Sequence, residues 1–179
     1  MRSTLLVAML VALVACKDKP LDWKPQAITS FEVGPFHFDV PPGWRDVSES
    51  KNPALATITH SLGPDAHMVV REKDSNTDTN IAVMWSDGSD QVSCMQFVDI
   101  MISQSGADGQ KIDKSSVRDE TFGSDKGCSL VLSDHGQPGH MFLRMRGNKM
   151  LTLLCLLRSG GDTDGDTTCT RMAAALKAQ

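Results

Sequence analysis

The stretch MLTLLCLLR, residues 150–158, constrains the fold more than any other part of the chain. In an extended chain Leu151 and Leu153 point one way, and Leu154 and Leu156 point the other. A strand that is apolar on both faces belongs near the centre of a sheet that is covered on both sides. The stretch therefore predicts a sheet with further elements packed against each of its faces.

Other strands surround this one. In the segment 31–44 (FEVGPFHFDVPPGW), apolar and polar residues alternate until Pro41-Pro42-Gly43 stops the strand. Short turns separate most of the strands, which predicts antiparallel pairing. The remaining strands are expected over residues 56–62, 67–73, 80–86, 112–121, 127–134 and 141–146.

Two segments change to helical spacing. Apolar residues recur every three or four positions over residues 91–105, with Asp90 as the expected N-cap and Gly106 as the stop. The same spacing returns over residues 167–178, where Asp166 is the expected cap. Together the elements predict an α+β domain, an antiparallel β-sheet flanked by helices.

The first residues resemble an export signal. Arg2 precedes an apolar run, LLVAMLVALV, over residues 5–14. This run is too short to span a bilayer, which needs about 20 apolar residues, but it suits a secretory leader. The run ends in Leu-Val-Ala-Cys at Cys16, which resembles the lipobox of bacterial lipoproteins. We expect residues 1–15 to be removed and Cys16 to be acylated. The alternatives are an ordinary secretory signal or a buried helix.

Three regions follow from this prediction: a signal peptide over residues 1–15, a lipidated cysteine with its linker over 16–29, and one periplasmic domain over 30–179. The linker carries two prolines and shows no periodicity. Removal of the leader lowers the formal net charge of −4 by one further unit, because Arg2 is lost. An acidic chain is a poor partner for nucleic acid, whose binding depends on Lys and Arg.

Four cysteines beyond Cys16 agree with export. An even number suits disulfides in an oxidising compartment, and four cysteines allow three pairings. We favour Cys155 with Cys169, because a strand, a short turn and a returning helix bring both over the same part of the sheet. Cys94 then pairs with Cys128.

The segment 36–44, FHFDVPPGW, resembles the opening strand, proline and Gly-Trp of the PsbP-like fold. The order of elements after it is similar as well: the strand at 81–85 leads into a helix, and residues 151–155 lead through a Gly/Asp turn into the last helix. The resemblance implies an α/β/α sandwich. It also implies a binding or assembly factor, because members of this fold share no catalytic motif that could be transferred to this chain.

Two Asp-rich segments are candidates for calcium loops. Residues 162–166 (DTDGD) place Thr167 and Ala173 where the EF-hand pattern requires Gly and Glu. We expect an acidic turn that caps the last helix. Residues 74–80 (DSNTDTN) also lack the glycine, and we expect a hairpin loop there.

The histidines do not form a metal motif, because none are spaced four residues apart on a helix. Ser133, Asp134 and His135 contain the residue types of a catalytic triad, but neighbours on a strand point to opposite faces. The sequence therefore predicts no catalytic residues, no metal site and no cofactor. The five histidines are His37, His60, His67, His135 and His140.

Two hypotheses for function follow. The first is a non-enzymatic, membrane-anchored lipoprotein whose periplasmic domain binds a protein partner at the cell envelope. The second is a lipoprotein that binds a small molecule or a metal ion, suggested by the histidines and the Asp-rich segments. Lys17, rather than Asp, follows the lipidated cysteine. We therefore expect sorting to the outer membrane.

Overall fold

The computed structural model of the protein describes residues 30–48, 62–63, 65–71, 79–88, 91–104, 110–158 and 161–178. The expected leader, lipidation site and linker lie outside these residues. So do nearly all of the strand expected over 56–62 and most of the Asp-rich segment 74–80.

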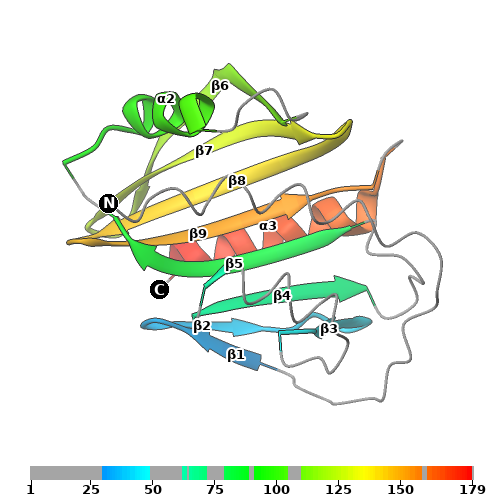
Figure 1. Ribbon diagram of the computed structural model, residues 1–179. Helices are drawn as coiled ribbons and strands as arrows, with labels where there is room; N and C mark the ends of the chain where they lie inside the picture. The colour runs from blue at the N-terminus through cyan, green and yellow to red at the C-terminus, as the bar shows by residue number, and fades with distance from the viewer. Residues whose placement is uncertain are drawn as a thin grey trace.

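Seven antiparallel strands form the main sheet, in the order β3-β4-β5-β9-β8-β7-β6 (Figure 1). The central position belongs to β9, as the sequence predicts. The strands are β3 (Trp44–Asp46), β4 (Ala66–Arg71), β5 (Asn80–Asp87), β6 (Gln110–Phe122), β7 (Asp125–Asp134), β8 (Gln137–Arg146) and β9 (Lys149–Leu156).

The alternation along β9 divides the interior into two cores. Leu151 and Leu153 belong to the core on one face of the sheet. Leu154 and Leu156 belong to the core on the other face. A strand buried on both sides cannot lie at an edge, and its neighbours β5 and β8 complete its backbone hydrogen bonds.

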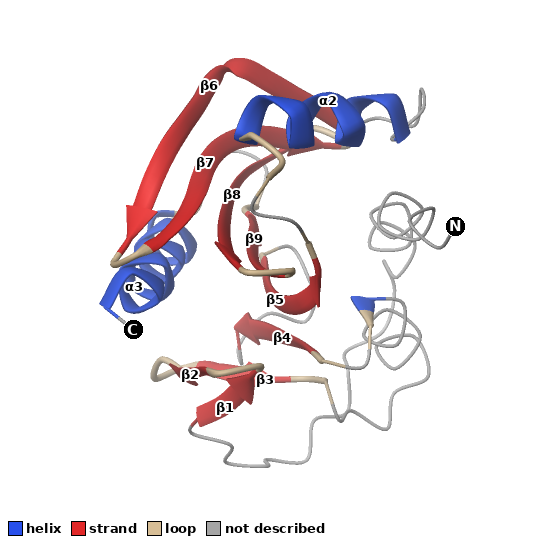
Figure 2. Ribbon diagram, turned by 90° about the vertical axis from the view of Figure 1, so that its left-hand side faces the viewer, coloured by secondary structure: helices blue, strands red, loops and turns tan. Residues whose placement is uncertain are grey.

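A hairpin and a helix cover the first face. The hairpin consists of β1 (Ser30–Val33) and β2 (Phe36–Asp39), and the helix is α3 (Thr163–Ala178). The second face carries α2 (Cys94–Gln104), so the two helices lie on opposite sides of the curved sheet (Figure 2). This arrangement is the predicted α+β fold, an antiparallel sheet flanked by helices.

The opening segment departs from the prediction of one strand over residues 31–44. It forms the separate hairpin β1–β2 and then the short edge strand β3. The hairpin turns at Gly34-Pro35, where Gly34 has a φ of 56°. A Cβ at Gly34 would lie 2.7 Å from the ring of Trp85, so only glycine fits this turn.

Both helices begin at positions other than those predicted. The N-cap of α2 is Ser93 and not Asp90, because Ser93 and Gln96 form the reciprocal hydrogen bonds of a capping box. The N-cap of α3 is Asp162 and not Asp166, since Asp162 Oδ1 accepts the Gly165 amide at 2.9 Å. In each case the true cap satisfies amides that would otherwise have no partner in the first turn.

Candidate protein-binding surface

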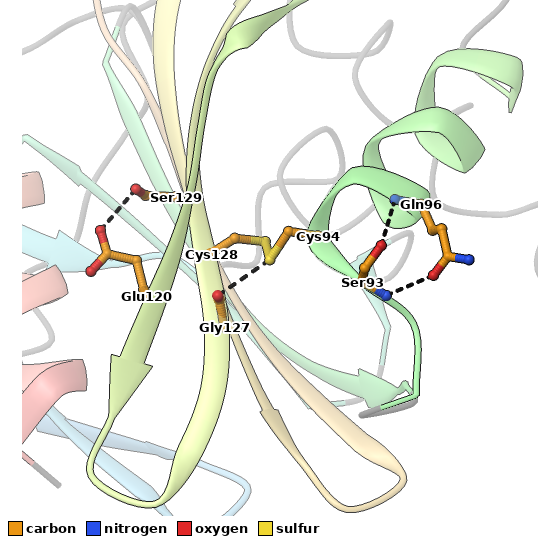
Figure 3. The surroundings of a disulfide bond; sticks show 7 residues. All are labelled: Ser93, Cys94, Gln96, Glu120, Gly127, Cys128 and Ser129. Atoms are coloured by element: carbon orange, nitrogen blue, oxygen red, sulfur yellow. Dashed lines mark hydrogen bonds between the residues drawn. A yellow bond between two sulfur atoms is a disulfide. The ribbon is translucent and has the colours of Figure 1, made fainter.

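A disulfide fixes the start of α2 to the sheet. Cys94, the first residue of the helix, is bonded to Cys128 of β7, with their Cα atoms 5.9 Å apart. The carbonyl oxygen of Gly127 lies 3.2 Å from Cys94 Sγ, so the sulfur is enclosed by the strand (Figure 3). The helix therefore starts from a covalently fixed point on β7.

Hydrogen bonds fix the same end of the helix. The Gln96 amide donates to Ser93 Oγ at 3.2 Å, and the Ser93 amide donates to Gln96 Oε1 at 2.9 Å (Figure 3). A capping box of this kind stabilises a helix by about 1 kcal/mol. Disulfide and cap together hold the first turn of α2 in a defined orientation.

One side of α2 packs on the sheet, where Cys94 and Val98 are buried and Phe97 and Met101 are half-buried. The part of the helix that does not pack on the sheet also carries apolar side chains. Four large apolar side chains are exposed among the described residues, and three of them stand on α2. They are Met95 (44% exposed), Ile100 (45%) and Ile102 (38%), with Val131 of β7 (39%) as the fourth.

Charge on this helix is balanced. Asp99 accepts a hydrogen bond from Lys114 of β6 at 2.6 Å, and both side chains are more than half exposed. This pair ties α2 to the edge strand and neutralises Asp99, the charged residue of the helix. Exposed apolar side chains on a rigid helix suit burial against another protein, because the helix loses little conformational freedom on binding.

The expected acidic turn at residues 162–166 is a structural junction. Asp162 Oδ1 and Oδ2 lie 2.6 and 2.7 Å from Arg71 Nη2, and the carboxylate also accepts hydrogen bonds from Thr79 and from the Gly165 amide. Burial raises the pKa of Asp162, but the bonds from Thr79, Gly165 and Arg71 outweigh it and hold the pKa below the ordinary 3.8. The carboxylate oxygens are therefore occupied by protein donors.

Only the end of the second Asp-rich segment, Thr79 and Asn80, lies within the described residues. Thr79 Oγ1 donates to Asp162 and accepts the Arg158 amide at 3.1 Å. This hydroxyl thus connects the start of β5 to the turn that precedes α3.

The histidines are dispersed over the fold. His37 is exposed on β2 and contacts Glu32 at 2.6 Å, while His140 Nε2 lies 3.6 Å from Asp166 of α3. His60 lies outside the described residues. No three His, Cys, Asp or Glu side chains gather in a metal-binding arrangement within the parts of the chain that the structure describes.

A Ser, His and Asp cluster that sequence analysis missed lies between β3 and β4. His67 Nδ1 is 2.6 Å from Asp46 Oδ2 and 3.0 Å from Ser48 Oγ. In a catalytic triad the serine and the carboxylate bond to different nitrogens of the imidazole, whereas here both contact Nδ1. Asp46 also binds the Ser48 amide, at 2.9 Å, so the cluster stabilises the chain after β3.

That cluster could not be found by spacing alone. Asp46 and His67 are 21 residues apart in the chain, and antiparallel pairing of β3 with β4 brings them together. The stacking of Phe31 on His67, with ring centroids 4.5 Å apart, adds a contact from the separate hairpin.

Of the sequence-adjacent set, Asp134 and His135 do contact one another. Asp134 Oδ1 lies 3.0 Å from His135 Nδ1 in the tight turn between β7 and β8. His135 has a φ of 48° and Gly136 a φ of 84°, as in a type I′ hairpin turn. Burial raises the pKa of Asp134 above 3.8 in spite of the His135 contact.

The second disulfide joins the central strand to α3. Cys155 of β9 is bonded to Cys169, and their Cα atoms are 6.1 Å apart. The four cysteines of the domain are thus paired as the sequence analysis predicts.

Among the described residues, no helix combines the length and the hydrophobicity that a membrane span requires.

Comparison with known proteins identifies the fold class. No protein-family model and no curated protein sequence matches the chain. The solution structure of CyanoP, the cyanobacterial PsbP of Synechocystis sp. PCC 6803, matches with a TM-score of 0.51 at 10% identity, over 78% of this chain and 83% of that one. The chain therefore has the PsbP-like fold.

Two further solved structures match with lower scores. A mutant of the protein Mog1 has a TM-score of 0.44 at 13% identity, over 83% of this chain and 86% of its own. LpqN, which is involved in cell envelope biogenesis of Mycobacterium tuberculosis, has a TM-score of 0.39 at 12% identity, over 78% of each chain.

Proposed function

We propose that this protein is a lipid-anchored component of the bacterial envelope whose domain binds a protein partner through the outer face of α2. The role is non-enzymatic: the domain holds its partner near the membrane to which Cys16 is tethered. The observation that carries the proposal is the concentration of exposed apolar side chains, Met95, Ile100 and Ile102, on one rigid helix.

Export to the periplasm is supported by the two disulfides. Each joins a helix to a strand of the main sheet: Cys94 of α2 to Cys128 of β7, and Cys169 of α3 to Cys155 of β9. Disulfides persist in oxidising compartments and are rare in the cytosol. An oxidising compartment is the destination that the leader ending at Cys16 would provide.

The tether adds a second argument for a binding role. A diacylated or triacylated cysteine anchors a protein firmly, whereas a single acyl chain gives only marginal binding. A firmly anchored domain raises the local concentration of its partner near the membrane surface. We place the anchor in the outer membrane, facing the periplasm, because Lys17 follows Cys16.

Photo-crosslinking in the native cell tests the proposal. A benzoylphenylalanine residue is placed at Ile100, and a matched one at Thr170, an exposed position on α3. We expect a discrete protein adduct from position 100 and none from position 170. The adduct must disappear when Met95→Glu is added, because a buried charge at the interface is costly.

Two results would contradict the proposal. One is an adduct of equal yield from Thr170, which would show that crosslinking does not depend on α2. The other is an adduct at Ile100 whose yield Met95→Glu lowers no more than Thr170→Glu does. The latter variant adds the same charge elsewhere. Circular dichroism of each variant verifies that the domain remains folded.

A further inference from the structure

A group of charged side chains lies on the face of the sheet opposite to α2, where β8 turns into β9. Arg144 and Arg146 of β8 each place Nε 2.8 Å from the same oxygen of Asp125, Oδ2. Their guanidinium carbons lie 4.9 and 4.8 Å from the centre of the Phe36 ring. The aromatic ring and the carboxylate thus hold both arginines in fixed orientations.

The two arginines differ in what they can still bind. Arg144 is 2% exposed, and its Nη1 donates to the carbonyl of Leu176 near the end of α3. Arg146 is 40% exposed, and only its Nε has a hydrogen-bond partner among the residues that the structure describes. With respect to the described part of the chain, the two Nη groups of Arg146 therefore form an oriented fork of donors without a protein acceptor.

Lys149 stands directly opposite Arg146 in the β8–β9 register. Its Nζ lies 2.8 Å from Asp87 of β5, and its side chain is 42% exposed. Like charges directly opposite one another on neighbouring strands destabilise a sheet. Here Lys149 pairs with Asp87, while Arg146 shares Asp125 with Arg144, so the three cations and two carboxylates of the group leave one positive charge over.

We propose that Arg146 and Lys149 form a seat for an acidic side chain, Glu or Asp, of a protein ligand. The planar fork of an arginine matches the two oxygens of a carboxylate, and the neighbouring ammonium adds a third donor. A bound carboxylate would neutralise the one positive charge that the three cations and two carboxylates leave over. Arg146 lies over the ring of Phe36, which half-buried Trp85 meets edge-on at 5.6 Å, and aromatic residues of this kind are typical of protein interfaces.

A peptide carboxylate is favoured over the phosphate of a membrane lipid. Recognition of anionic membranes uses clusters of about four to eight basic residues, whereas this seat offers two exposed cations.

Binding of a fluorescein-labelled hexaglutamate peptide to the full-length protein in non-ionic detergent micelles tests the seat. Fluorescence anisotropy is measured at low ionic strength, where screening is weak. We expect Arg146→Gln to weaken binding about tenfold and Lys149→Gln about threefold. Lys126→Gln is the matched control, since it removes the same charge from an exposed position on β7.

The proposal requires that Lys126→Gln binds as the unmodified protein does and that micelles doped with phosphatidylglycerol do not displace the peptide. No binding of the peptide, equal weakening by Lys126→Gln, or displacement by phosphatidylglycerol would overturn it. Near-ultraviolet circular dichroism verifies that Arg146→Gln and Lys149→Gln are folded. The seat and α2 lie on opposite faces of the sheet, so the two proposals are tested independently. Peptide binding can fail while crosslinking through α2 succeeds, and crosslinking can fail while peptide binding succeeds.

Discussion

Arg71 of β4 and Asp162, the cap of α3, form an ion pair between residues 91 positions apart in the chain, with Nη2 and Oδ1 separated by 2.6 Å. The same arginine lies over the ring of Trp44, 5.2 Å from its centre. One carboxylate therefore joins the start of a helix, the second strand of the sheet and, through Arg71, the edge strand β3.

Replacing this carboxylate should destabilise the domain. We expect Asp162→Ala to lower the free energy of unfolding by about 3 kcal/mol, because the helix loses its cap and Arg71 loses its main partner. Urea denaturation measures the change. Asp164→Ala is the control: Asp164 is 68% exposed, and its loss should stay within about 0.5 kcal/mol. Equal effects of the two substitutions would refute the role given to Asp162.

The effect of Asp162→Ala on the free energy of unfolding should depend on pH. The pKa of Asp162 lies below 3.8 in the folded protein, so its ionised form contributes stability above pH 3.8. That contribution is lost as the pH falls through the lower, folded pKa. The difference in stability between Asp162→Ala and the unmodified protein should therefore shrink below pH 3.8, as urea titrations at several pH values would show.

The contribution of Asp134 to stability should have the opposite dependence on pH. Its side chain is 1% exposed, and Oδ2 has no hydrogen-bond partner among the described residues. Burial raises its pKa, so stability is lost as the pH rises from 3.8 through the folded pKa. We expect Asp134→Asn to stabilise the protein by about 1 kcal/mol at neutral pH, with the gain vanishing below pH 3.8.

Thermal unfolding of Asp134→Asn across this pH range makes the comparison. Asp119→Asn, at an exposed position on β6, serves as the control and should change little. A loss of stability at neutral pH in Asp134→Asn would show that the ionised carboxylate is satisfied in the folded state.

The disulfides should each contribute a large part of the net stability. The loop between Cys155 and Cys169 spans 14 residues and that between Cys94 and Cys128 spans 34. In the chain-entropy model, replacing both members of a pair by alanine lowers the free energy of unfolding by about 3 and about 4 kcal/mol respectively. Denaturant curves of the two double variants measure this. Curves that do not shift in either variant would exclude a stabilising role.

Any side chain at position 34 should destabilise the domain. Gly34→Ala combines a left-handed backbone with a clash against Trp85 and should cost about 2 kcal/mol or more. Gly123→Ala is a matched control, because Gly123 has a φ of 61° and a Cβ added there would meet nothing within 4 Å, so it should cost about 1 kcal/mol. Chemical denaturation of both variants distinguishes the two costs, and equal values would mean that the Trp85 contact is unimportant.

The fold was largely predictable because its pattern is local. The two-sided apolar pattern of residues 150–158 placed β9 at the centre of the sheet, and the strand-turn-helix order after it indicated the Cys155–Cys169 pair. The helix starts were misplaced because several acidic or hydroxyl residues precede each helix. Ser93 with Gln96 has the spacing of a capping box, and this signal in the sequence favours Ser93 over Asp90 as the cap.

The polar clusters were not predictable, because they depend on contacts between distant strands. Asp46 reaches His67 only after β3 pairs with β4, and Arg146 opposes Lys149 only in the register of the β8–β9 hairpin. The exposure of Ile102 was likewise hidden, because helical spacing places it with Val98 and Met101 on the apolar face, yet its side chain is 38% exposed.

The mass of the mature N-terminal peptide, obtained from protein extracted from the membranes of the native cell, tests the lipid anchor itself. We predict a chain that begins at Cys16, carries a thioether-linked diacylglycerol and is found in the outer-membrane fraction. A chain that retains residues 1–15, or one that begins at Cys16 without any acyl group, would rule the anchor out.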